Sequence, residues 1–171
     1  IRNFSELGTL AALSDVDASA LDAMKESYPN VAQYADFADM LNDNTIDAIA
    51  ISTPAVTHGQ MTRQALDAGK HVFVEKPLCL DLIEAKDLED RAERSDRVLM
   101  VGHMMLYHPA FRALRRAVQD GKTGDLRYIY STRLSLGKIR REENALWSFA
   151  PHDISMILAL TGESGSGKSM T

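Results

Sequence analysis

The chain has 171 residues, of which 45% are hydrophobic, and a formal net charge of -5, so it can bury a core within one or two small domains. An acidic balance without a basic run gives no electrostatic footprint for nucleic acid, and the apolar stretches are too short to span a bilayer, so neither is expected as a partner. Cys79 is the single cysteine, which excludes a disulfide framework and is typical of a cytoplasmic protein.

Short apolar runs alternate along the chain with longer stretches of helical period, as in βα units around a parallel sheet. A first helix is expected to end at Gly8. The predicted strands occupy residues 10–13, 31–34, 46–54, 71–74 and 98–101. The predicted helices occupy residues 18–26, 56–68 and 81–94, with a short helix capped by Asp36 and a later helix that begins at Pro109. Residues 46–74 form the clearest βαβ crossover.

The hydrophobic pattern changes after residues 121–124. Residues 126–136 alternate with period two, as in a half-solvated antiparallel strand. We therefore expect a second domain of different construction to begin here. No group of His, Asp and Glu in the sequence has the spacing of a metal site.

Polar residues follow several of the predicted strands. Open parallel sheets bind ligands at the carboxyl ends of their strands, so chemistry is expected at these positions. They are Asp15, Ser52–Pro54, Glu75–Pro77 and Gly102–His103. For Ser52–Pro54, a turn that caps the next helix explains the same residues.

Asp15 stands where a dinucleotide-binding fold places an acidic residue, at the end of its second strand, to bind the ribose hydroxyls. Such a residue normally follows a Gly-rich turn by about 20 residues, and too few residues precede Asp15 here. We therefore expect the first strand and its Gly-rich turn to lie upstream of Ile1. A solvated turn aspartate is the alternative explanation.

Lys76 follows a buried strand and precedes Pro77, which restricts the backbone before it. Beside an oxidised nicotinamide, a partly desolvated lysine can assist removal of a proton from a substrate hydroxyl. A surface lysine at the end of a strand is the alternative.

A family likeness is carried by three parts of the chain, namely residues 46–54, the Thr53-Pro54 turn with His58, and residues 72–77. They resemble the glucose-fructose oxidoreductase, inositol dehydrogenase and rhizopine-catabolism (Gfo/Idh/MocA) family, over about residues 1–162. The resemblance implies an α/β fold: a Rossmann-like doubly wound parallel sheet that lacks its first strand, followed by the start of an α+β substrate domain. We assign residues 1–122 to the dinucleotide-binding domain, 123–161 to the substrate domain and 162–171 to a tail.

The same resemblance implies roles for individual residues. Lys76 would touch both nicotinamide and substrate, between Glu75 and Pro77, which shape a bend whose Lys76–Pro77 bond is hypothesised to be cis. Asp15 would hold the adenosine ribose and favour NAD over NADP. The cofactor groove would be lined by Ser52, Thr53, Pro54 and His58.

His152 matches the family's histidine that opens the long helix of the substrate domain and faces the sugar. At a helix start, the positive end of the helix dipole would lower its proton affinity. Ser148 stands where members often carry an aspartate, which resembles the branch acting on nucleotide sugars, such as 3-dehydrogenases of UDP-N-acetylhexosamine derivatives. For His103 and His108, core or capping roles are expected, and contact with a substrate is the alternative.

The implied reaction is hydride transfer from a ring carbon of a sugar or nucleotide sugar to NAD, while Lys76 and His152 handle the hydroxyl proton. The full-length enzyme is expected to be a cytoplasmic homo-oligomer, and this chain, as a fragment, to be inactive alone. A non-catalytic dinucleotide-binding or scaffold protein is an alternative.

Residues 162–169 satisfy the phosphate-loop pattern and resemble the nucleotide-binding loop of peptide-transporter ATPases. An ATP-binding transporter component is therefore a further alternative. A working phosphate loop also needs the helix after it and a downstream acidic strand end. We expect a junction near Gly162 and a flexible tail without ATPase activity.

Overall fold

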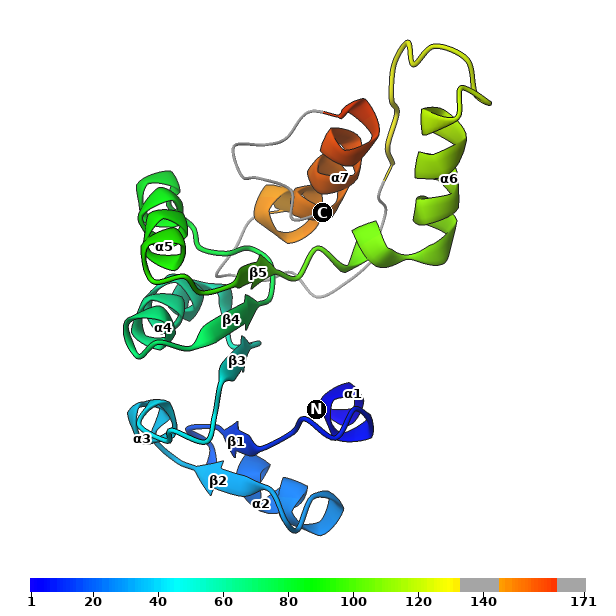
Figure 1. The fold of residues 1–171 in the computed structure, drawn as a ribbon. Helices are drawn as coiled ribbons and strands as arrows, with labels where there is room; N and C mark the ends of the chain where they lie inside the picture. The colour runs from blue at the N-terminus through cyan, green and yellow to red at the C-terminus, as the bar shows by residue number, and fades with distance from the viewer. Residues whose placement is uncertain (133–144, 163–171) are drawn as a thin grey trace.

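The computed structural model describes residues 1–132 and 145–162. Its strands form two parallel sheets (Figure 1). The smaller sheet pairs β1 (Ala12–Ser14) with β2 (Ala32–Tyr34), and the larger has the order β3 (Ala48–Ile51), β4 (His71–Val74), β5 (Leu99–Val101). All neighbouring strands are parallel and alternate with helices along the chain, which is the Rossmann-like α/β fold that the sequence predicts.

Helices connect the strands in the expected alternation. They are α1 (Arg2–Glu6), α2 (Ala18–Ser27), α3 (Phe37–Leu41), α4 (Ala55–Asp67), α5 (Leu82–Arg94), a 3-10 helix (Met104–Tyr107), α6 (Pro109–Gln119) and α7 (Ala145–Thr161). Three of them begin at an aspartate whose carboxylate accepts a hydrogen bond from a backbone N–H of the first turn, namely Asp17, Asp36 and Asp81. Such caps satisfy donors that the helix itself leaves unpaired.

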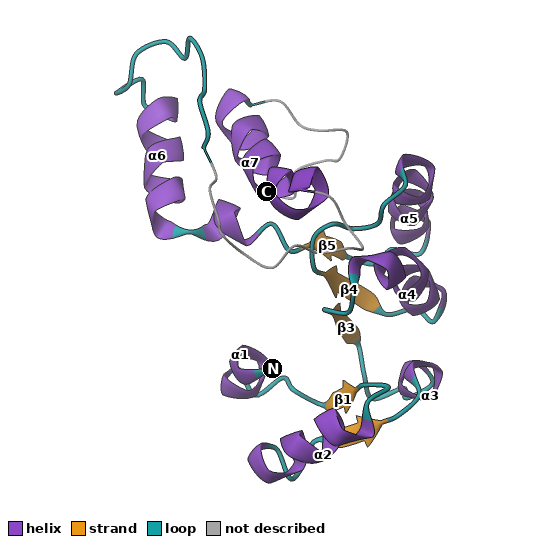
Figure 2. Ribbon diagram, turned by 180° about the vertical axis from the view of Figure 1, so that it is seen from behind, coloured by secondary structure: helices purple, strands orange, loops and turns teal. Residues whose placement is uncertain are grey.

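The hydrophobic core lies between the larger sheet and the helices α4 and α5, which cover one side of it (Figure 2). Val74, Ala65 and Leu88 are fully buried there, one from each of β4, α4 and α5. In β3, Ile49 and Ile51 are buried and Ala48 and Ala50 are exposed, because successive strand residues point to opposite faces. This packing holds the carboxyl ends of β3 and β4 in place.

The predicted strand at residues 126–136 is wrong over its described part. Residues 126–132 form no strand, and Tyr128 and Tyr130 are 84% and 83% exposed. Alternation of apolar and polar residues selects two faces, but a strand also needs a neighbour to pair with, and none lies beside this segment in the described residues. Residues 133–136 lie outside the described part.

The predicted start of the last helix at residues 151–152 is also wrong. Helix α7 begins at Ala145 and contains Pro151 within it, so His152 lies about two turns inside the helix. The dipole of a helix acts within its first turn, so the expected effect of a helix start on His152 does not apply. Within the described residues, no helix combines the length and the apolar character needed to cross a membrane.

Candidate functional site

The carboxyl ends of β3, β4 and β5 reach the same edge of the larger sheet. The register aligns Ile51 with Val74, and Val74 with Val101. Each of these residues ends its strand, so the segments that follow leave the sheet side by side. The structure therefore brings together Ser52–Pro54, Glu75–Pro77 and Gly102–His103.

His58 ties two of these segments to each other. It lies in the first half of α4 and is 2% exposed. Its Nδ1 is 2.7 Å from the carbonyl oxygen of Pro77, and its Nε2 is 2.8 Å from the carbonyl oxygen of Thr53. The Thr-Pro-x-x-x-His and Glu-Lys-Pro motifs are thus parts of one hydrogen-bonded unit, whereas the predicted contact of His58 with a cofactor groove stays a prediction.

The turn after β4 carries the candidate catalytic lysine. The Lys76–Pro77 peptide bond is cis, as hypothesised, and both Glu75 and Lys76 are half-buried. A Cβ atom on Gly102 would lie 2.9 Å from Oε2 of Glu75. The Glu75 carboxylate therefore lies against the end of β5 at Gly102, and a side chain there would displace it. Nothing local in the sequence indicates this contact.

The turn after β3 presents polar groups to solvent. Ser52, Thr53 and Pro54 are exposed. The hydroxyl groups of Thr53 and Thr57 are 2.8 Å apart, and Thr57 also donates to the carbonyl oxygen of Pro54. No side chain caps the start of α4 at Pro54, so helix capping does not occupy the Ser52 side chain.

Asp15 lies apart from these segments, at the carboxyl end of β1 in the smaller sheet. Its carboxylate is exposed and accepts a hydrogen bond of 2.9 Å from the backbone N–H of Asp17. The geometry is that of an Asx turn. The predicted interaction with an adenosine ribose stays a prediction.

His152 and His103 lie near each other, beyond the carboxyl end of β5. Helix α7, which carries His152, packs against the 3-10 helix that follows His103. Burial lowers the pKa of His103, and the proximity of His152 lowers it further. The Nδ1 atom of His103 is buried without a hydrogen-bond partner among residues 1–132 and 145–162. A contact of His103 with a substrate stays a prediction.

His108 has the capping role that is expected from the sequence. Its Nδ1 accepts a hydrogen bond of 3.2 Å from the backbone N–H of Ala110 at the start of α6. Because this ring nitrogen is engaged by the helix, His108 is a cap.

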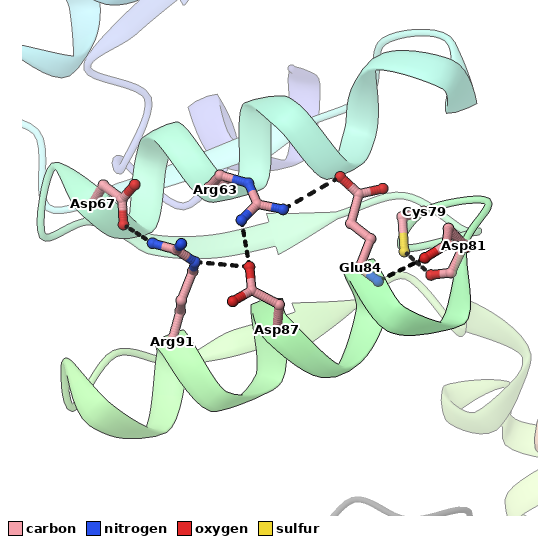
Figure 3. Close-up of polar contacts among 7 residues, drawn as sticks. All are labelled: Arg63, Asp67, Cys79, Asp81, Glu84, Asp87 and Arg91. Atoms are coloured by element: carbon pink, nitrogen blue, oxygen red, sulfur yellow. Dashed lines mark hydrogen bonds and ion pairs between the residues drawn. The ribbon is translucent and has the colours of Figure 1, made fainter.

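Ion pairs hold together the two helices that follow the turns at residues 52–54 and 75–77 (Figure 3). Arg63 on α4 contacts Glu84 and Asp87 on α5, and Arg91 on α5 contacts Asp87 and Asp67. The hydrogen bond from Arg91 is the main cause that lowers the pKa of Asp87. These pairs fix α4 against α5 and so support the residues at the strand ends.

Cys79 lies just after the Lys76 turn and is buried. Its Sγ donates to the carbonyl oxygen of Asp81, and burial raises the pKa of the thiol (Figure 3). A thiol with a raised pKa is a poor nucleophile. Cys79 is therefore a packing residue of this loop.

Two sequence features fall where the structure gives no side-chain description. These are Ser148 and the phosphate-loop pattern from residue 163 onward. Among the residues that are described, no group of three or more His, Cys, Asp and Glu side chains could hold a metal ion.

Comparison of this chain with known proteins identifies related sequences. The sequence model of GFO_IDH_MocA, the oxidoreductase family with an NAD-binding Rossmann fold, matches residues 1–103. UDP-N-acetylglucosamine 3-dehydrogenase of Acidithiobacillus ferrooxidans is 36% identical over 118 residues, which cover 68% of this chain and 36% of the relative. Myo-inositol 2-dehydrogenase of Thermotoga maritima is 28% identical over 159 residues, which cover 90% and 48%.

Solved structures agree with these matches. Scyllo-inositol dehydrogenase from Lactobacillus casei, crystallised with NAD(H) and scyllo-inositol, superimposes with a TM-score of 0.74 at 26% identity, covering 90% of this chain and 48% of that one. A probable dehydrogenase from Thermotoga maritima gives 0.78 at 27% identity, covering 91% and 48%. The chain spans no more than about half the length of the curated relatives it matches.

Proposed function

This chain belongs to the GFO_IDH_MocA oxidoreductase family, with its NAD-binding Rossmann fold, and we propose that it supplies the cofactor-binding and proton-transfer residues of an NAD-dependent dehydrogenase. The substrate class is a sugar or nucleotide sugar, oxidised at a hydroxyl-bearing carbon. The observation that carries this proposal is the pair of strand-end turns joined by His58, one polar and exposed, the other bearing Lys76.

The residues at the sheet edge fit a dinucleotide. Ser52 and Thr53 offer exposed hydroxyl groups at the carboxyl end of β3, where open α/β sheets bind ligands. Bound there, NAD would supply the acceptor for the substrate's hydride.

The chain's own task in this reaction is to orient the substrate and to take its hydroxyl proton. In this proposal Lys76 accepts that proton as the C–H bond breaks, and His152 is the second proton-handling group. The substrate is left as a ketone. The lysine rests on a rigid element because its turn is joined through His58 to α4.

The decisive experiment expresses the reading frame together with whatever sequence flanks these residues in its own DNA. NADH formation is then measured with UDP-N-acetylglucosamine, myo-inositol and scyllo-inositol as substrates. We expect turnover with at least one of them, and a loss of about 10²–10⁴-fold in kcat for Lys76→Ala, the range for a general acid–base group. Lys25→Ala, on the exposed face of α2, is the matched control. Unchanged turnover in Lys76→Ala would remove the lysine from the mechanism.

Cofactor choice depends on Asp15. A carboxylate at the ribose attracts the hydroxyl groups of NAD and repels the extra phosphate of NADP. Calorimetric titration of the same protein with NADH and NADPH should therefore favour NADH, and Asp15→Ser should reduce the difference. An unchanged preference in Asp15→Ser would exclude Asp15 as its cause.

The nucleotide-sugar substrate, the cytoplasmic location and the homo-oligomeric state belong to the same proposal. The nucleotide sugar is supported by Ser148 and by the 3-dehydrogenase among the relatives. Light scattering after size-exclusion chromatography measures the oligomeric state directly.

A further inference from the structure

His58 faces two groups that can only accept hydrogen bonds. The carbonyl oxygens of Pro77 and Thr53 lie 2.7 Å and 2.8 Å from its two ring nitrogens, and a carbonyl oxygen has no proton to donate. A neutral imidazole carries a single N–H, so its other nitrogen would point a lone pair at a carbonyl lone pair. Both distances lie in the range of charge-assisted N–H···O bonds. Only the doubly protonated ring can donate to both carbonyl groups.

Two other histidines of the chain have the opposite geometry. Nδ1 of His71 accepts a hydrogen bond of 3.0 Å from the backbone N–H of Val98, and Nδ1 of His108 accepts one from Ala110. A backbone N–H can only donate, so these two Nδ1 atoms carry no proton. The ring of His58 therefore differs from those of His71 and His108 in its hydrogen-bond partners, which are acceptors at both nitrogens.

The surroundings of His58 contain groups of both charges. Glu75 and Lys76 belong to the turn whose Pro77 carbonyl it binds. From α5, the carboxylate of Glu84 lies against Gly59, the next residue after His58, and is paired with Arg63 on α4. A buried cation needs hydrogen bonds for its N–H groups and a compensating charge nearby. Both N–H groups of His58 have a carbonyl partner, and the carboxylates of Glu75 and Glu84 belong to the adjoining turn and helix.

We propose that His58 is a positively charged clamp, an imidazolium that donates to the carbonyl groups of Thr53 and Pro77 and positions the Lys76 turn against the turn after β3. The protonation state is argued from the hydrogen-bond geometry alone. The positioning of Lys76 for proton transfer rests on the proposed function. Because the clamp joins consecutive strand ends, it fixes the separation between the polar turn and the lysine.

NMR of the histidine rings in the isotope-labelled chain tests the protonation state near neutral pH. We expect His58 to show a bonded proton on both ring nitrogens, with slow solvent exchange, and His71 and His108 to show an unprotonated Nδ1. Signals are assigned by replacing the other histidines one at a time. A single bonded proton on His58 would overturn the charged clamp. The outcome does not depend on turnover, so failure of the proposed dehydrogenase activity is seen separately.

The positioning role is tested through Lys76 itself. The rate of acylation of Lys76 is compared with that of Lys25 by mass spectrometry in the original chain, in His58→Phe and in His58→Gln. We expect the Lys76 rate to change several-fold in His58→Phe, the Lys25 rate to stay constant, and His58→Gln, whose amide can still donate, to restore most of the original rate. Equal Lys76 rates in all three folded proteins would refute the positioning role. If His58→Phe does not fold, His58→Leu takes its place as the variant without a donor, and an unchanged Lys76 rate in it would refute the positioning role.

Discussion

Replacing His58 with phenylalanine should destabilise the protein strongly, although the two rings have similar size. The ring is 2% exposed, and phenylalanine fills most of its volume, so a large cavity does not form. The carbonyl groups of Thr53 and Pro77 each lose their donor. A buried polar group without a partner costs about 1–3 kcal/mol. The bond to Pro77 is buried and the bond to Thr53 is only partly buried, so the two losses together cost about 2–4 kcal/mol.

The free energy of unfolding, measured by urea titration near neutral pH, gives this number directly. A loss of that size is a large part of the roughly 5–15 kcal/mol that holds a domain folded. His71→Phe is the matched control because it removes one hydrogen bond from a half-buried ring, which costs about 1 kcal/mol. His58→Gln should fall between the two variants.

The reasoning is refuted by a loss in His58→Phe no greater than that in His71→Phe. That result would mean that the two carbonyl groups find water or another donor when the ring cannot supply one. The hydrogen bonds of His58 would then not be needed to hold the turns together.

Other side chains give further tests. Lys70 is 6% exposed, and its Nζ donates to the carbonyl groups of Asp43 and Ile46. Lys70→Met should therefore lower the free energy of unfolding, measured in urea, by about 3 kcal/mol or more. The control Lys25→Met, which removes an exposed ion pair, should lower it by less than about 1 kcal/mol. Burial and the nearby His152 lower the pKa of His103 below its ordinary 6.5, so the unfolded chain binds more protons and stability falls as the pH drops below that value. His103→Gln should flatten this part of the stability curve, and an unchanged curve contradicts the assignment. The pKa of Asp87 is lowered from 3.8, mainly by the hydrogen bond from Arg91. The Asp87 carboxylate therefore adds to the stability of the fold above that pH, and this stability is lost as acid protonates the group. Asp87→Asn should remove this acid-dependent loss, measured as the melting temperature from neutral to acidic pH.

The local elements could be predicted from the sequence because their hydrogen bonds are local. Asp17, Asp36 and Asp81 cap helices through backbone N–H groups two or three residues away, and such spacing is visible in a sequence. Buried strands between amphipathic helices likewise indicated the parallel sheet. Lys76 and the other residues at the strand ends are singled out by their position after predicted strands and by the family resemblance.

Two predictions failed where a local pattern was not sufficient. The alternation in residues 126–132 indicates a strand, but pairing depends on a neighbouring strand that the pattern does not contain. His152 is expected from the sequence to open a helix, yet α7 begins at Ala145 and continues through Pro151. In both segments the outcome depends on what lies alongside the chain.

By itself the sequence determined the order of strands and helices, the caps, and the motif residues that follow β3 and β4. Only the tertiary structure decided that His58 binds both turns, that Gly102 admits the Glu75 carboxylate, and that His103 lies near His152. The physical reason is distance along the chain. Apart from the bond between His58 and Thr53, the partners in these contacts are far apart in sequence, and they meet because the sheet register and the packing of the helices bring them to one edge.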